Sequence, residues 1–323
     1  MPGACDDPDL RGDVAPSDSG TAGLPSAGAY LRGAATAGGE PSTVVRASHE
    51  TRASRRATSE AAVLAADDDA RARDALPIPL LTTTATLAIS LLIAVSGPSG
   101  QLTTGLALVF AGLVLAWGWP SLLGSPSPRW SGVVVGVGGV SVPATAGLTP
   151  DAEQLRWLPV PIGITLILCF LQQLLRRDRT RLTDGLAASI AGLAIATAGA
   201  PLAVVPVCRG GSTYLVAAMA AVAVGALVEQ LTRVGSVQRW VLVPVLLAGG
   251  LTAYVVALLA AGTLTTVPAL LIGVLAAAIS HALRRVMAVQ PTAAAVPSAL
   301  ANGTASVLIV GVVVYLLTRV FIG

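Results

Sequence analysis

The sequence contains no lysine and is poor in charged residues of every kind. Charged side chains make up 11% of the 323 residues and aromatic ones 4%, whereas 54% are hydrophobic. A soluble globular domain carries roughly a quarter charged residues, so this composition excludes that class. Twenty of the 37 charges precede Leu76, and the last 247 residues carry only 17. The longer part of the chain is therefore predicted to lie in lipid.

The basic residues are all arginine, which we interpret as the coding bias of a GC-rich bacterial genome. The net charge of +3 therefore does not indicate a nucleic-acid partner, and none is expected. Cysteine is scarce too. Cys5, Cys169 and Cys208 are odd in number, far apart and without a Cys-x-x-Cys motif or a Cys/His group. This spacing predicts no disulfide framework, no zinc site and no other cofactor.

The amino-terminal region lacks both apolar periodicity and a signal-peptide pattern. Residues 1–76 mix Asp, Gly, Ala, Pro, Ser and Arg, and such a composition cannot bury enough surface to offset the entropy of ordering. We predict a disordered cytoplasmic tail with one short surface helix near residues 58–74. No basic segment followed by an apolar one occurs in the first 30 residues, so the first hydrophobic span is expected to direct membrane insertion.

Residues 77–323 are predicted to form an all-α domain, a polytopic transmembrane helix bundle whose partner is the lipid bilayer. A bilayer core about 30 Å thick needs about 20 apolar residues of helix. Scanning for such segments between turn signals gives about nine, within a range of eight to ten. They are residues 78–96, 102–119, 131–148, 157–175, 185–207, 213–231, 241–261, 267–283 and 300–321.

Arginines near the span ends predict the orientation, because positive flanks stay on the cytoplasmic side. A cytoplasmic amino terminus puts eleven of the fourteen arginines from Arg71 onward inside, and only Arg156, Arg209 and Arg319 outside. We therefore expect a multi-pass protein of the bacterial plasma membrane. Nine crossings leave Gly323 outside, which Arg319 opposes. Either the last segment is misassigned, or residues 288–298 partly re-enter the membrane.

Tryptophans give independent support for the segmentation, since interfacial belts suit amphipathic rings. All five fall at predicted span ends: Trp117, Trp119, Trp130 and Trp240 on the inner side, and Trp157 on the outer side.

An internal repeat is suggested by paired motifs. Arg129-Trp130 opens the third span and Arg239-Trp240 opens the seventh, 110 positions later. The pairs 138–139 and 249–250, both Gly-Gly, follow at similar distances. The hypothesis is a parallel 4+4 repeat with a ninth span appended. Against it, any inner flank is expected to carry arginine.

Two ionisable side chains lie near the inner ends of predicted spans. Glu229 is within about one turn of the end of the sixth, and His281 is three residues before Arg284 on the eighth. Both fit an ordinary interfacial role. The functional alternative is that they line the inner mouth of a shared cavity, where an imidazole can change charge near neutral pH. That alternative requires the sixth and eighth spans to be adjacent.

Prolines inside spans are the second candidate feature, because each removes a helix hydrogen bond. Pro143 in the third span and Pro201 in the fifth are candidate cavity-lining residues. Most such prolines merely kink a helix, but a broken helix can expose backbone groups to a polar substrate. The glycine-rich third span is the best candidate for such a broken helix.

Enzyme motifs are missing or incomplete. Asp184-Gly185 opens like the signature of the CDP-alcohol phosphotransferases, but Ser189 stands where arginine is needed, and Leu202 and Pro206 where aspartates are needed. The divalent-metal site of that family therefore cannot form. No other catalytic motif is found, so no enzyme is predicted.

The residues from Leu115 to Gly124, read as LAWGWPSLLG, are followed by Pro126, Pro128 and Arg129-Trp130. This stretch resembles a family of multi-pass integral membrane proteins of actinobacteria, the high-GC Gram-positive bacteria. That family has no assigned activity. The resemblance therefore implies a bacterial inner membrane and transfers no functional residues.

Two functions remain open. Many spans, short loops and proline-interrupted helices favour a small-molecule permease. The alternative is a non-catalytic scaffold or assembly subunit of a larger envelope complex, acting as a homo-oligomer or with a membrane partner protein, which the polar tail and the lack of charge at mid-depth favour.

Overall fold

The structure is a computed structural model that describes the chain in eight stretches. They are residues 78–125, 127–149, 154–175, 182–232, 240–260, 266–290, 292–293 and 295–322. The predicted tail, residues 1–76, and its short helix near 58–74 lie outside these residues. The described helices belong to one compact unit.

Every regular element in the described residues is a helix, which confirms the predicted all-α transmembrane bundle. Within the described residues, nine segments are long and apolar enough to cross a membrane. The α-helices are α2 (Ile78–Ser96), α3 (Gln101–Leu122), α4 (Pro128–Leu148), α5 (Pro159–Leu175), α6 (Leu182–Gly199), α7 (Gly211–Leu231), α8 (Leu242–Leu259), α9 (Thr266–Ala288), α10 (Val296–Leu308) and α11 (Gly311–Ile322). Short 3-10 turns are η1 (Gly97–Ser99), η2 (Gln154–Trp157), η3 (Ala200–Ala203) and η4 (Val205–Val207).

The fifth and ninth spans are interrupted. After Gly199 the fifth continues as the 3-10 turns η3 and η4, and the ninth consists of α10 and α11 separated by two residues. A Cβ built on Gly199 would lie 2.6 Å from Leu308 of α10, and one on Gly311 would lie 3.0 Å from the Gly199 Cα. The two interruptions therefore pack directly against each other.

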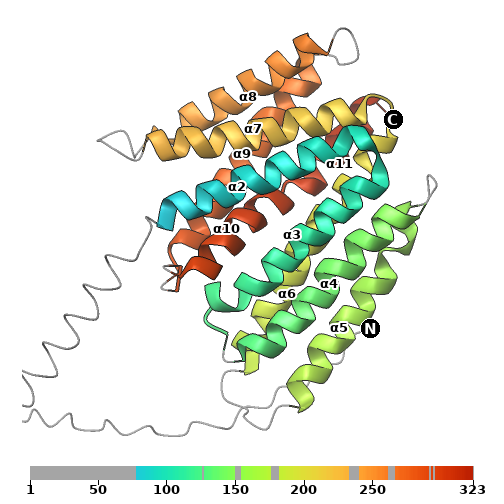
Figure 1. Ribbon diagram of the computed structural model, residues 1–323, viewed down its shortest axis with the longest axis vertical. Coiled ribbons are helices and arrows are strands. Elements are labelled where there is room, and N and C mark those ends of the chain that lie inside the picture. The colour runs from blue at the N-terminus through green and yellow to red at the C-terminus, as the bar shows by residue number, and fades with distance from the viewer. Residues whose placement is uncertain are drawn as a thin grey trace, which may run out of the picture. The chain divides into compact units, whose positions relative to one another are not determined.

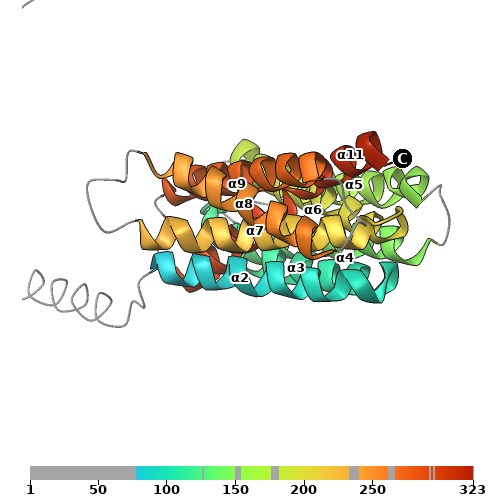
Figure 2. The same ribbon diagram turned by 90° about the horizontal axis from the view of Figure 1, so that it is seen from above.

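The helices fall into two groups on either side of α2 and α10 (Figure 1). On one side α7, α8 and α9 pack together, and α7 also contacts α2. On the other side α3, α4, α5 and α6 lie next to one another. Figure 2 shows the long helices lying lengthwise beside one another. Helix α10 contacts α2, α3, α6 and α9, and nearly all its residues from Ser298 to Leu308 are buried.

Glycines allow the backbones of α3 and α4 to come into direct contact. Because lipid is as apolar as leucine, helices in a membrane associate through close packing rather than through the hydrophobic effect. A Cβ on Gly105 of α3 would lie 2.8 Å from the Gly147 Cα of α4, and one on Gly139 of α4 would lie 2.9 Å from the Gly112 carbonyl oxygen of α3. The backbones of α3 and α4 thus touch at two levels.

One tryptophan does not have the interfacial position expected for it. Trp119 is only 1% exposed, its Nε1 donates to the Ala188 carbonyl at 2.8 Å, and its ring lies against Gly192 of α6. The other four, Trp117, Trp130, Trp157 and Trp240, are exposed. The absent side chain of Gly192 makes room for an indole inside the bundle, so Trp119 belongs to the core.

The ninth segment is a full-length span, Val296–Phe321. The carboxyl end lies close to where α2 ends, opposite the end where α2 begins (Figure 1). We name the two ends of the bundle the Ile78 end and the Ser96 end. The turn before α10 rests on the end of α3, since Thr292 donates to the Leu122 carbonyl at 2.5 Å. The 4+4 repeat stays a prediction.

Candidate functional site

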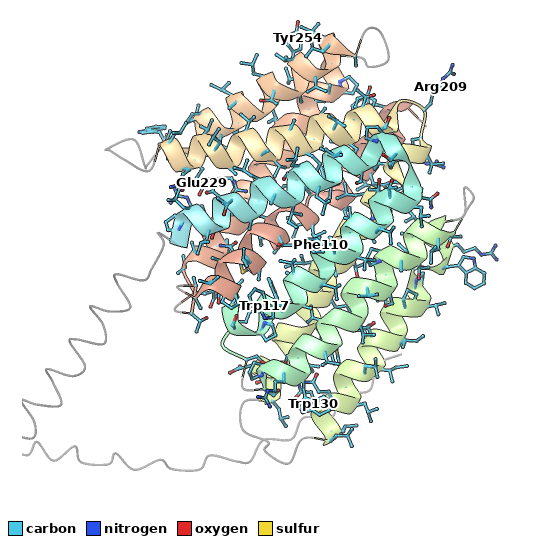
Figure 3. The ribbon with its side chains drawn as sticks, viewed as in Figure 1. Phe110, Trp117, Trp130, Arg209, Glu229 and Tyr254 are labelled. Carbon is cyan, nitrogen blue, oxygen red and sulfur yellow. The ribbon has the colours of Figure 1, made fainter. Side chains whose placement is uncertain are left out.

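The structure brings together Glu229 and His281, on α7 and α9. His281 Nδ1 lies 3.0 Å from Glu229 Oε2, and the two residues are 6% and 3% exposed. One turn earlier on each helix, a Cβ on Gly225 would lie 3.4 Å from the Ala277 Cβ. These small side chains let α7 and α9 approach closely, so the carboxylate and the imidazole meet. Figure 3 shows Glu229 at the Ile78 end of the bundle and Arg209 at the other end.

Arg284 completes this ionic cluster, which we define as Glu229, His281 and Arg284. Its Nε donates to Glu229 Oε2 at 3.1 Å, and its Nη2 lies 3.0 Å from the same oxygen. Sequence reasoning treated Arg284 as a topology marker beside Arg285. The overlooked signal is spacing, because residues three and four apart share a helix face and Arg284 lies three residues after His281.

Serine and threonine hydroxyls extend the cluster toward mid-depth. Arg284 donates to the Ser280 hydroxyl at 2.6 Å and to the Ser306 hydroxyl of α10 at 3.3 Å. Ser306 is in turn 3.4 Å from the Thr86 hydroxyl of α2. Thr86 is eight residues into α2, or about 12 Å along the helix axis. Four helices, α2, α7, α9 and α10, therefore share one polar network.

Two buried polar atoms next to this network have no hydrogen-bond partner among the described residues. They are the Ser90 hydroxyl, one turn beyond Thr86 on α2, and the side-chain amide oxygen (Oδ1) of Asn302, one turn before Ser306 on α10. Ser90 is 1% exposed and Asn302 is 5% exposed. Burying a polar group without a partner costs about 1–3 kcal/mol, and such groups in native proteins usually bind water or a ligand.

The two prolines differ in their effect. Pro143 lies inside α4, which continues unbroken to Leu148, so the prediction that the third span is the broken helix is wrong. A proline inside a helix removes one backbone hydrogen bond, but α4 keeps its helical geometry beyond Pro143. Pro201 lies in η3, where the fifth span leaves α-helical geometry. Both prolines are buried. The cavity-lining role of Pro143, Pro201, Glu229 and His281 stays a prediction.

Two grooves elsewhere in the described residues are apolar. One of about 430 Å³ lies between α8 and α9, and one of about 380 Å³ between α2 and α3. Tyr254 lines the first groove and Phe110 lines the second, and Tyr254 lies far from Glu229 in Figure 3. Neither groove is lined by the ionic cluster.

The donor set of the cluster suits protons better than metal ions. Among the described residues no three His, Cys, Asp or Glu side chains gather closely enough to hold a metal. The only carboxylate in the cluster already faces a guanidinium, whose positive charge opposes a bound cation. No protein-family model, curated protein or solved structure matches this chain.

Proposed function

We propose that this polytopic membrane protein is a permease for a small polar solute, situated in a bacterial plasma membrane with its amino terminus in the cytoplasm. The observation that carries the proposal is the ionic cluster inside a bundle of membrane-spanning helices. Ionisable residues within a membrane are costly, and they usually mark substrate, ion or proton pathways.

The polar character of α10 supports the same function. This helix lies between the two groups of helices, and its Ser298, Asn302, Thr304 and Ser306 are all buried. Small polar side chains also serve helix packing in membranes, but packing alone does not require the Asn302 side-chain oxygen, which has no partner among the described residues. The interruption after Leu308, about 20 Å along the helix from Val296, leaves irregular backbone at depth, which membrane proteins tolerate where it is enclosed by protein or lines a water-filled cavity.

Thiol labelling separates a permease from the alternative, a non-catalytic scaffold. In a background that carries C5S, C169A and C208S, Ser90→Cys and Asn302→Cys put thiols in place of the two unpartnered side-chain atoms. A permease is expected to admit a charged, membrane-impermeant methanethiosulfonate to both sites, because a solute pathway contains water.

Two further single cysteines serve as controls. Leu251→Cys, on the exposed face of α8, should not react, since lipid covers it. Arg209→Cys, exposed at the Ser96 end, should react at once. If Ser90→Cys and Asn302→Cys are as unreactive as Leu251→Cys, the bundle is dry and the scaffold is the correct function.

A further inference from the structure

The contact between His281 and Glu229 determines where the imidazole proton lies. A carboxylate only accepts hydrogen bonds, so Nδ1 of His281 must carry hydrogen and donate it to Glu229 Oε2, 3.0 Å away. In the neutral ring the other nitrogen, Nε2, then holds a lone pair. The geometry therefore prepares one specific atom, His281 Nε2, to accept a proton.

The charge balance around His281 is simple. On α9 itself the neighbouring charged groups are Arg284, within the cluster, and Arg285, which is not part of it. On the helices that contact α9 in the described residues, Glu229 of α7 is the only acidic side chain. The packed helices α2 and α10 contain no titratable side chain. On α8, Tyr254 faces an apolar groove away from the cluster, and on α11 the titratable residues are Tyr315 and Arg319.

We infer that His281, held by Glu229, is the proton-binding site of this protein, and that proton binding there drives the solute movement proposed above. Protonation forms an N–H bond at Nε2 from a proton supplied by water, breaks no bond in the protein, and changes the summed charge of Glu229, His281 and Arg284 from 0 to +1. The coupling part of this inference rests on the proposed function.

The hydroxyl network gives this charge change a route to mid-depth. Arg284 contacts both Glu229 and Ser306. When the imidazolium competes for the carboxylate, the guanidinium is less strongly held by Glu229 and its bonds to Ser280 and Ser306 are redistributed. Ser306 lies two residues before the end of α10, so the change reaches the interruption in the ninth span.

Nitrogen NMR of the full-length protein in lipid bilayers tests proton binding directly. The chain has two histidines, and His49→Asn leaves [15N]histidine at position 281 alone. As the pH of the sample is lowered, His281 is expected to pass reversibly from neutral with hydrogen on Nδ1 to imidazolium. A ring that keeps one protonation state throughout, or a neutral ring with hydrogen on Nε2, overturns the inference.

Glu229→Gln tests the positioning role of the carboxylate. An amide can donate as well as accept, so the preference for hydrogen on Nδ1 is expected to be lost. If that preference persists, Glu229 does not position the ring. His49→Asn alone, which leaves the cluster intact, is the reference, and it tests proton binding by itself if the Glu229 variant does not fold.

Coupling is tested with the thiol at Asn302→Cys. We compare its labelling rate in two proteins that share the C5S, C169A and C208S background, one with His281 and one with His281→Gln. The rate is expected to depend on pH differently in the two, and comparing them at matched pH cancels the effect of thiol ionisation. Identical pH profiles overturn coupling while the NMR result still decides proton binding. If the thiol never reacts, the proposed function fails, and a titrating His281 is then a proton site without a solute path.

Discussion

At the scale of single residues, Glu229 and Arg284 depend on each other because both are buried. Removing one partner of a buried ion pair typically costs about 3–5 kcal/mol, since the other charge stays unpaired. We predict that Glu229→Gln and Arg284→Met each lower the free energy of unfolding by about 3 kcal/mol. The double variant should lose less free energy of unfolding than the two single losses added together, because it leaves no uncompensated charge. Reversible unfolding in mixed micelles measures this.

Arg285→Met is the matched control for that cycle. It removes a guanidinium from the next residue of α9, which is only partly buried. Substitutions of this kind usually change stability by about 0.5 kcal/mol or less. Strictly additive losses at 229 and 284 would show that the two charges are not coupled.

Residue-level prediction succeeded for types of residue and not for their contacts. Glu229 and His281 stand out in the sequence because ionisable groups are rare in an apolar span. The contact of Arg284 with Glu229 was not predicted, because the positive-inside rule treats every arginine at a span end alike. Trp119 was hidden for a similar reason. Its burial depends on Gly192, 73 positions away, and only the packed bundle shows that pairing.

At the scale of elements, the glycine contacts between α3 and α4 give a separate prediction. Gly139→Val places branched carbon against the Gly112 backbone, so the helices must separate. Overpacking of this kind typically costs about 1–3 kcal/mol, and contact with backbone puts the expected loss at the upper end. The melting temperature of the purified protein should fall accordingly.

Gly163→Val is the control for this change. Gly163 lies on α5, and an added Cβ meets nothing within 4 Å, so the melting temperature should stay nearly constant. Equal losses at positions 139 and 163 would show that the loss does not come from the α3–α4 contact, since helix propensity by itself favours valine over glycine.

Helix prediction was accurate where a span is one unbroken α-helix, with one exception: α9 continues to Ala288, beyond its predicted end at residue 283. The first predicted span, 78–96, coincides with α2. The last residues of α4, α5 and α7 are also the last residues of their predicted spans. The interruption of the fifth span falls at Pro201, which the sequence singles out, but the interruption of the ninth span was not located. Pro143 lies where α4 tolerates a proline, and the break between α10 and α11 contains no proline at all. Its position depends on the fit of Gly311 against Gly199, a contact between distant segments.

At the scale of the whole molecule, nine crossings put the two ends of the helical domain on opposite sides of the membrane. The native cysteines report on this without any substitution. Cys208 is partly exposed beyond η4, near the Ser96 end, and Cys169 is buried in α5. Cys5 lies in the amino-terminal region. With a cytoplasmic amino terminus, an impermeant maleimide added to spheroplasts should label Cys208 alone.

Permeabilising the spheroplasts should then add Cys5 to the labelled sites and leave Cys169 unlabelled, since the apolar bundle shields its thiol. C208S and C5S variants identify each labelled peptide. Labelling of Cys5 in intact spheroplasts would reverse the orientation and move the ionic cluster to the outer face, because Glu229 lies at the end where α2 begins. Proton binding at His281 would then draw on the external medium, so the same experiment fixes the side from which protons enter.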